Sequence, residues 1–485
     1  MFRSLAVRNY RVYASGAIVS NVGTWLQRVA QDWLVLSLTG SGTALGITTG
    51  LQLLPALLFS PIAGLVADRF GKRRVMMVTQ MMMAAPAALL GVLAITGTVE
   101  VWHVYVLAFL FGVGTAFDAP ARQSFVVEMV GKDDLANAVG LNSASFNSGR
   151  MIGPALAGVL IAALGSGVAA TGWVILLNAL SYFAVLASLL ALRVRELFPA
   201  PRADRGRGGI VDGLRYVRSR PDVMLILVTV FFVGTFGMNF QMTSALMATE
   251  VFDKGAQGYG VLGSIMAIGS LAGALVAARR ERPTRRLVVG AGLAFAGVEI
   301  TAGLMPTYLA FALVLPFLGL AALTMITSAN AYIQLTVDPS MRGRVAALYL
   351  MVFMGGTPLG APVIGWIGET FGARWTLILG GLVTLGGIAA ATITYLVRGD
   401  LHVRLDVRPR PRLLVVPRTP RALVGTAGAL SAADEAARVD AGVAEAELPT
   451  YEGERPYDGD QPRSGDTPSS YEPVGCAATE DRRAG

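Results

Sequence analysis

Between two long apolar runs stands the stretch Gly64-Leu-Val-Ala-Asp68-Arg69-Phe70-Gly71-Lys72-Arg73-Arg74. An apolar run that ends in Asp-Arg-x-Gly and three cations is typical of a helix that leaves a membrane and enters a tight, basic turn. Gly64 would permit close helix contact, Gly71 would allow the chain to reverse, and the cations would keep the turn on the cytoplasmic side. The stretch therefore predicts a membrane protein.

Composition excludes several other classes. The chain has 485 residues, of which 54% are hydrophobic, and a mean hydropathy of +0.57. It is too apolar and too long for one soluble core, so we expect a protein that crosses the membrane many times. The net charge of +8 comes from cations in loops between apolar runs, which excludes nucleic-acid binding as its explanation.

The sequence contains few of the residues on which enzyme active sites are commonly built. Cys476 is the single cysteine, and the two histidines, His103 and His402, are far apart, so no disulfide, metal site or histidine-based catalytic site is expected. No Gly-x-x-x-x-Gly-Lys-(Ser/Thr) phosphate loop is present, which excludes ATP hydrolysis by this chain. We therefore expect neither an enzyme nor a bound cofactor.

Apolar windows bounded by Gly, Pro and charged residues predict about twelve membrane helices, each near the length a bilayer requires. The first helix contains Arg28 and Asp32 and lacks a small-residue cleavage site, so it is not a removable signal peptide. The expected spans are 12–38, 43–67, 75–97, 101–122, 137–164, 170–192, 222–248, 257–278, 286–305, 307–330, 343–368 and 374–397.

Cations separate the connections into two alternating sets. One set is basic, whereas the other is short and carries only Lys254 and Arg374, so both termini are expected in the cytoplasm. The basic set contains Arg69, Lys72, Arg73, Arg74, Lys132, Arg193, Arg195, Arg202, Arg205, Arg207, Arg215, Arg218, Arg220, Arg279, Arg280, Arg282, Arg285, Arg286, Arg342 and Arg344.

A linker and a repeat divide the chain into two halves. Residues 193–221 are basic, contain Pro and Gly and have no apolar run, which predicts six-helix halves at 1–192 and 222–397. Gly149-Arg-Met-Ile-Gly153-Pro154-Ala-Leu-Ala-Gly158 has a partner in Gly356-Thr-Pro-Leu-Gly360-Ala-Pro362-Val-Ile-Gly365. Small residues at such steps also serve as ordinary packing surfaces in membrane bundles, but together with the linker they favour two repeated halves.

The tail at 398–485 has a different character. It is basic and interrupted by Pro at first, then acidic and rich in Gly, Pro and Ala. Such a segment cannot bury enough apolar surface to fold, so we expect a disordered cytoplasmic tail with at most a short helix near 431–439. Its basic part could lie on anionic headgroups or be a solvated extension.

The loop stretch resembles the signature between the second and third helices of the major facilitator superfamily. Further stretches resemble its bacterial drug and siderophore exporters, the macrolide efflux and enterobactin exporter branch. The likeness covers residues 1 to about 400 and is more specific in the first half. The stretches that carry it are Trp25-Leu-Gln-x-x-Ala30-Gln31-x-Trp33-Leu-Val, Gln52-Leu-Leu-Pro55, Pro120-Ala-Arg122-Gln-Ser-Phe, Leu135-Ala-Asn137-Ala and Leu141-Asn-Ser.

The resemblance implies gating roles for Gly64, Asp68, Arg69, Gly71 and Arg73. Asp68 would cap the start of the eleventh helix, whose free N–H groups favour an anion, and Arg69 or Arg73 would meet an acid on helix 4. Asp118 is the acid near the cytoplasmic end of that helix. The alternative is that these charges only set topology and lie in solvent.

Helix 5 resembles the antiporter signature of the superfamily. The pattern consists of Gly149, Gly153, Pro154 and Gly158, with Ala157 in place of one expected Gly. A helix face without side-chain bulk, together with a Pro kink, would allow tight packing that seals one side, and the signature favours export over import. Packing with no bearing on direction is the alternative.

The first helix has a polar face, which must line a water-filled cavity or contact another helix because exposure of polar groups to lipid is unfavourable. Asp32 is the expected proton carrier, with Arg28 one turn away as its partner, unless the two form a static ion pair. Arg150 is a third charge with an expected role in coupling, whereas Glu299 is expected to be structural or interfacial. The Arg that many proton-coupled drug exporters carry in helix 4 is absent from residues 103–117. Residues expected at the substrate cavity are Asn21, Trp25, Gln31, Gln52, Asn142, Asn178 and Asn239.

Together these features predict an all-α bundle of twelve membrane helices in the plasma membrane, acting as a monomer. Resemblance implies export of an amphiphilic small molecule by alternating access, with the proton gradient as the energy source and no cofactor. Two alternatives stay open: an importer or lipid-moving facilitator of the same fold, and a membrane sensor that signals through its tail. No motif specifies the substrate, because twelve helices together shape the cavity.

Overall fold

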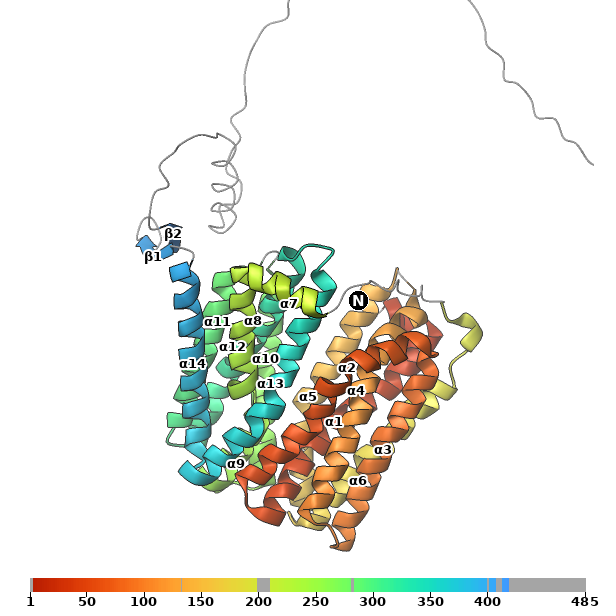
Figure 1. The fold of residues 1–485 in the computed structure, drawn as a ribbon. Coiled ribbons are helices and arrows are strands. Elements are labelled where there is room, and N and C mark those ends of the chain that lie inside the picture. Colours follow the sequence, from red (N-terminus) through yellow and green to blue (C-terminus); the bar gives the residue numbers. More distant parts are fainter. Residues whose placement is uncertain are drawn as a thin grey trace, which may run out of the picture. The chain divides into compact units, whose positions relative to one another are not determined.

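The computed structural model describes residues 3–131, 133–198, 210–280, 283–398, 401–406 and 412–417, all within the unit of residues 1–422. Six long helices come first, and we call them the N-terminal half (Figure 1). They are α1 (Arg8–Thr39), α2 (Gly42–Arg69), α3 (Lys72–Thr96), α4 (Val101–Val130), α5 (Leu135–Ala163) and α6 (Val168–Leu190). A short 3-10 turn, Arg3–Ala6, precedes them and another, Val194–Glu196, follows.

A short amphipathic helix, α7 (Ile210–Ser219), leads into the C-terminal half. The seventh long segment is broken by two π-helical turns: α8 (Pro221–Phe232), η3 (Val233–Gly237), α9 (Phe240–Leu246) and η4 (Met247–Val251). Five further helices complete this half: α10 (Ala256–Ala278), α11 (Arg285–Leu304), α12 (Tyr308–Thr336), α13 (Arg342–Phe371) and α14 (Ala373–Arg398).

Ten helical segments in the described part of the chain are long and apolar enough to cross a membrane. The prediction of twelve spans is therefore confirmed for ten. The other two long helices are α1 and α5, which are also the helices that carry Arg28, Asp32 and Arg150. Polar residues lower the hydropathy of a helix, and α1 and α5 are shielded from lipid only where other helices cover their polar faces.

The helix ends follow from local chemistry. Gly40 and Gly97 adopt left-handed conformations, with φ of 61° and 73°, and close the ends of α1 and α3. Ser41, Thr284 and Thr307 accept hydrogen bonds from backbone N–H groups at the starts of α2, α11 and α12. Such caps satisfy N–H groups that the helix itself leaves free.

The segment after α14 differs from its expectation in one respect. Two short strands, β1 (Leu401–Asp406) and β2 (Arg412–Pro417), pair antiparallel where the sequence predicted no regular structure. Alternating apolar residues in Leu401-His-Val-Arg-Leu-Asp406 are compatible with a strand. The rest of the predicted disordered tail, including the expected helix near 431–439, lies outside the described residues.

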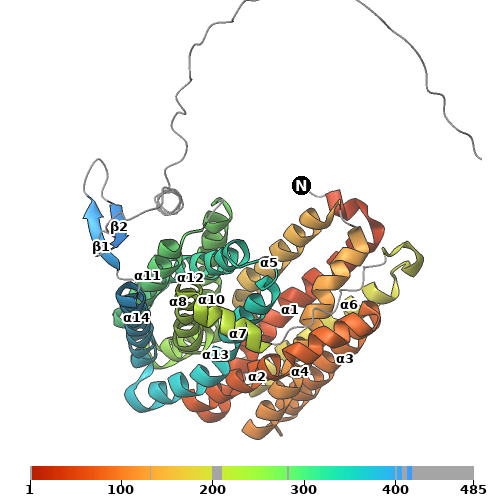
Figure 2. The same cartoon turned by 45° about the horizontal axis from the view of Figure 1, so that its top comes forward.

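The two ends of the helix bundle are unlike each other. We call the end that holds the α2–α3 turn, with Lys72, Arg73 and Arg74, the basic end; the α1–α2 turn lies at the opposite end (Figures 1 and 2). Lys132 and the cations at 202, 205, 207 and 282, which the sequence assigns to the basic end, are outside the described residues.

Glycines bring the two halves into contact toward the opposite end. A Cβ on Gly46 of α2 would lie 2.3 Å from the Ala361 carbonyl oxygen of α13, and one on Gly260 of α10 would lie 2.2 Å from the Pro154 carbonyl oxygen of α5. No Cβ can occupy such positions, so these helices touch backbone to backbone. We call these two contacts, α2 with α13 and α10 with α5, the glycine seams.

The repeat in α5 and α13 has a structural counterpart. Gly149 and Gly153 of α5 face α1, at Asn21 and Trp25, while Gly158 faces Ala256 of the other half. In α13 the corresponding glycines 356 and 360 face Thr235 in η3, while Gly365 faces Gly42 of the other half. Each helix thus packs on the first long segment of its own half and on the partner half.

Contact between the halves is sparse at the basic end. A Cβ on Gly64, Gly71, Gly140 or Gly343 would meet nothing within 4 Å. The expectation that Gly64 permits close helix contact is wrong for this structure, because the side of α2 on which Gly64 lies is open, whereas the neighbouring Ala63 and Ala67 are buried. Gly71 is also no special turn residue, since its φ of −59° is open to any residue. The molecule is therefore closed at the opposite end and apart at the basic end.

Candidate functional site

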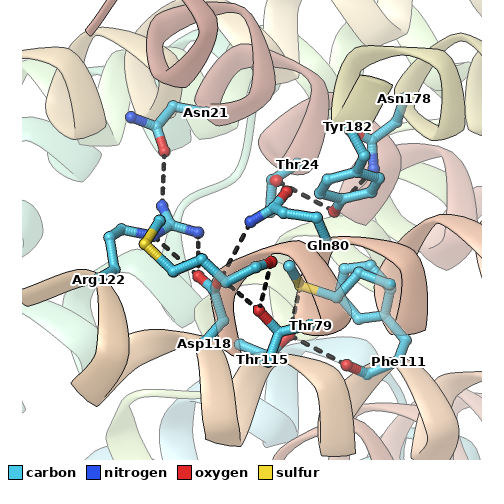
Figure 3. A network of polar contacts seen from close by, with 12 residues as sticks. Asn21, Thr24, Thr79, Gln80, Phe111, Thr115, Asp118, Arg122, Asn178 and Tyr182 are labelled. Carbon is cyan, nitrogen blue, oxygen red and sulfur yellow. Dashed lines mark hydrogen bonds and ion pairs between the residues drawn. The ribbon is translucent and has the colours of Figure 1, made fainter. Parts of the chain in front are cut away.

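Asp118 lies at the centre of a buried polar network inside the N-terminal half (Figure 3). Its side chain is only 3% exposed and pairs with Arg122, one turn further along α4. Thr79 Oγ1 and Gln80 Nε2 of α3 donate to Asp118 Oδ1 at 2.8 and 2.9 Å. A buried carboxylate with a paired cation and two further donors is well satisfied, so this network holds α3 and α4 together.

The same network continues to α1, α5 and α6. Arg122 reaches Asn21 Oδ1 at 3.4 Å, and Asn21 donates to Ser145 Oγ of α5 at 2.9 Å. On the other side, Asn178 of α6 donates to the Tyr182 hydroxyl, which in turn contacts Thr24 of α1 (Figure 3). Asn178 also donates to Gln27 of α1. Asn21 and Asn178 were expected to line the cavity, but their hydrogen bonds are made inside the N-terminal half.

Helix 4 carries a cation after all. The sequence predicts its end near residue 122, whereas α4 continues to Val130 and places Arg122 two turns inside the helix. The statement that residues 103–117 lack an Arg holds, but Arg122 supplies a partly buried cation from just beyond them.

The loop signature makes different contacts from those expected. Lys72 Nζ lies 2.5 Å from Glu128 Oε1 of α4, and Arg73 donates to the Leu189 carbonyl of α6 at 2.7 Å. Asp118 meets Arg122 and not Arg69 or Arg73, because it lies deeper in the half. A cation of the loop does meet an acid on helix 4, but the pair is Lys72 and Glu128.

Asp68 does not cap the eleventh helix. Asp68 and Arg69 are exposed, and the N-cap of α13 is Met341, which makes no side-chain cap. The expectation fails because α2 and α13 are apart at the basic end. A role for Asp68 in a state closed at that end stays a prediction.

Asp32 forms a buried hydrogen bond between the halves. Tyr259 of α10 donates its hydroxyl to Asp32 Oδ2 of α1 at 2.6 Å, and the two residues are 2% and 8% exposed, respectively. Among the described contacts, Asp32 forms no ion pair with Arg28, so the static ion pair is wrong for this state, whereas a role of both residues in coupling stays a prediction. A carboxyl that bridges two halves changes its surroundings when they move apart.

Arg28 turns away from Asp32. Its guanidinium donates to Gln241 Oε1 of α9 at 3.2 Å and lies 5.2 Å from the centre of the Trp25 ring. Arg150 of α5 lies 5.7 Å from the centre of the same ring. Cation–π contacts contribute about 0.5–2 kcal/mol, whereas removing a charge from water costs several kcal/mol. The ring alone therefore does not compensate two guanidinium groups.

The other residues expected at the substrate cavity differ in their burial and in their hydrogen bonds. Gln31 is buried with Oε1 unpartnered, and Trp25 Nε1 is a buried donor without an acceptor, both among the described contacts. Asn239 donates to the Thr235 carbonyl at 2.8 Å, within the C-terminal half. Gln52 and Asn142 are half-buried, and no side-chain hydrogen bond is described for either.

Glu299 is a buried acid inside the C-terminal half. It is 1% exposed, its Oε2 has no partner within the described residues, and it lies beside Gly237 of η3 and Gly380 of α14. An internal position agrees with the structural role expected for it and not with an interfacial one. No group of three or more His, Cys, Asp or Glu is placed to hold a metal in the described part of the chain.

Sequence reasoning missed Tyr259, Lys72 and Glu128. Tyr259 is a lone aromatic in a Gly-rich helix, and only the three-dimensional contact between halves reveals it. Lys72 belonged to the quoted stretch, and its side chain could have been paired with Glu128 only by knowing that α4 is eight residues longer than the predicted end at residue 122.

Comparison with known proteins matches residues 2–414 to a family described as transmembrane secretion effector. The multidrug efflux pump Tap of Mycolicibacterium fortuitum is 31% identical over 79% of this chain and 95% of its own. The staphyloferrin A transporter of Staphylococcus aureus is 24% identical over 82% and 98%. Macrolide efflux protein A of Streptococcus pyogenes is 23% identical over 82% and 99%.

Solved structures share the fold. A bacterial homologue of the human lysosomal transporter Spinster, in an inward-facing and occupied conformation, matches with a TM-score of 0.63 at 15% identity, over 82% of this chain and 96% of its own. The nucleoside transporter NupG matches with a TM-score of 0.63 at 12% identity, over 80% and 99%.

Proposed function

Because the chain belongs to the transmembrane secretion effector family of the major facilitator superfamily, we propose that it exports an amphiphilic small molecule in exchange for protons. It is a membrane transporter and not an enzyme. The exchange, its direction and the class of substrate are the proposal. The observation that carries it is the buried hydrogen bond from Tyr259 to Asp32, which ties one ionisable group to the contact between halves.

Asp32 couples protons to movement through its surroundings. While the opposite end is closed, the Tyr259 hydroxyl donates to the Asp32 carboxyl, and the contact between the halves covers that carboxyl. Separation of the halves at that end removes this donor and exposes the carboxyl to the side of the membrane from which the proton would come. Asp32 would take up a proton when the opposite end opens and release it when that end closes.

This coupling gives antiport if the basic end faces the cytoplasm. The cations gathered at that end support this orientation in the plasma membrane. Substrate would then enter from the cytoplasm in the state described here, and the proton would enter from outside in the other state. The proton gradient drives the cycle, without a bound cofactor.

The substrate class rests on the relatives. The names of three of them refer to multidrug efflux, staphyloferrin A and macrolide efflux. An amphiphilic drug, antibiotic or siderophore, moved by a monomer in the lipid bilayer, is therefore the proposed cargo. The proposed contacts are Trp25, Arg28, Gln31 and Arg150, of which Arg28 reaches Gln241 of the other half.

Transport into inverted membrane vesicles tests the function. We expect fluorescent amphiphiles to accumulate in vesicles that contain the protein when the lumen is made acidic, and a protonophore should abolish accumulation. Vesicles without the protein are the control. Uptake in right-side-out vesicles instead would indicate an importer, and no movement of any compound in either orientation would contradict transport of this class of molecule.

A further inference from the structure

Two cationic side chains of the N-terminal half have no ion-pair partner among the described residues. Arg28 and Arg150 come from α1 and α5, and their guanidinium carbons lie 5.2 and 5.7 Å from the centre of the Trp25 ring. Neither forms an ion pair within 4 Å among the described residues. We call Trp25, Arg28 and Arg150 the arginine–tryptophan cluster.

The buried acids Asp32, Asp118 and Glu299 make their described contacts with groups other than Arg28 and Arg150. Asp32, one turn from Arg28, accepts from Tyr259, and Asp118 is paired with Arg122. Glu299 lies within the C-terminal half against η3 and α14. Among the described residues, no acid is therefore within ion-pair distance of either guanidinium, and Asp32 acts on Arg28 only at longer range.

The hydrogen-bond donors of the cluster also favour an oxyanion as its ligand. Trp25 Nε1 is a buried donor without an acceptor, and no hydrogen bond is described for the Arg150 guanidinium. Arg28 uses one donor on Gln241. A guanidinium presents donors in a planar fork that matches carboxylate and phosphate oxygens. The two guanidinium groups therefore have donors left for an oxyanion, and Trp25 Nε1 is a further free donor beside them.

We propose that the arginine–tryptophan cluster binds an oxyanion carried by the substrate, so that the exported molecule is an amphiphile with a carboxylate or similar acidic group. This inference rests on the proposed transport function and names its substrate class. Gln241 belongs to the C-terminal half, so Arg28 also ties the site to the contact between halves. Binding of the anion would therefore occur beside a hydrogen bond that changes when the two halves move relative to each other.

Binding of a matched pair of probes tests the proposal. Dansyl-undecanoic acid and its methyl ester differ mainly in charge, and their affinities for the full-length protein in phosphatidylcholine nanodiscs can be measured by fluorescence. We expect the acid to bind about tenfold more tightly than the ester, which corresponds to about 1.4 kcal/mol. Equal affinities would overturn the proposal.

Variants assign the effect to the cluster. Arg28→Gln and Arg150→Gln should each remove most of the preference for the acid and leave the ester nearly unchanged. Arg150→Lys keeps the charge but loses the fork, so it should retain an intermediate preference. Arg218→Gln, which removes an exposed cation from α7, is the matched control. An unchanged preference in both Gln variants, with thermal unfolding like wild type, would overturn the assignment.

Lipid headgroups offer the same chemistry and are tested separately. If a short-chain phosphatidylglycerol displaces the acid from the protein as well as unlabelled undecanoic acid does, the site belongs to a lipid headgroup and the assignment to substrate falls. Gradient-driven transport of the ester or of cationic dyes with no preference for acids would also refute this inference while leaving the transport function intact.

Discussion

Asp32→Asn should abolish transport driven by a proton gradient and leave exchange of substrate across the membrane. The amide keeps the size of the side chain, and its oxygen can still accept from the Tyr259 hydroxyl, so the contact between halves survives. What disappears is the titrating group. Gradient-driven accumulation in inverted vesicles should fall to the level of vesicles without the protein, whereas counterflow, which needs no net proton movement, should persist.

Two further variants make this result specific. Tyr259→Phe keeps the carboxyl but removes its donor, so coupling should weaken without vanishing. Asp253→Asn removes an exposed carboxylate at the opposite end and is the control, because its φ of 50° is tolerated by Asn. Gradient-driven transport by Asp32→Asn at the wild-type rate would show that another group carries the proton.

Gly46→Val and Gly260→Val should each prevent closure at the opposite end. The added Cβ would lie 2.3 and 2.2 Å, respectively, from backbone carbonyl oxygens of the other half, which cannot move aside like a flexible side chain. Overpacking of this kind costs about 1–3 kcal/mol or more. Because the seams join the halves, the cost falls on one state of the transporter, and transport should be severely reduced while the protein still folds.

Distances between spin labels and thermal unfolding distinguish state from stability. Labels at Thr98 and Lys254, exposed at the opposite end in different halves, should move apart in both variants. Gly269→Ala is the contrasting variant, since its Cβ would lie 1.9 Å from the Pro316 oxygen within one half, so it should lower the unfolding temperature instead. Gly290→Ala, with nothing within 4 Å of its Cβ, should change neither. Unchanged label distances in both seam variants would contradict the role of the seams.

The fold was largely accessible from the sequence, because hydrophobic length and loop charge are local properties. The repeat in α5 and α13 was also accessible, since glycines spaced along one helix face keep their meaning wherever the helix packs. The prediction for helix 4 is eight residues too short, because a charged residue ends an apolar window in the sequence, whereas Arg122 and Glu128 form ion pairs within the half and the helix continues.

The site was less accessible, because its contacts join residues far apart in the chain. Asp32 was singled out as an intramembrane acid, but its partner across the halves, Tyr259, has no local signal. Asn21 and Asn178 illustrate the converse error: a polar residue in a membrane helix can face a cavity or another helix of its own half, and periodicity alone does not separate the two. The state of the transporter also matters, since Asp68 lies apart from α13 here.

The central claim is that the charge on Asp32 governs closure at the opposite end, and one measurement tests it most directly. The distance between labels at Thr98 and Lys254 would be measured in nanodiscs at neutral and acidic pH, with Cys476 replaced by serine, in wild type and in Asp32→Asn. Acidification should shift wild type toward longer distances, because the neutral carboxyl is the weaker acceptor for Tyr259, and the variant should show the same distribution at both pH values. A wild-type distribution that ignores pH, or a variant that follows pH as wild type does, would contradict the account.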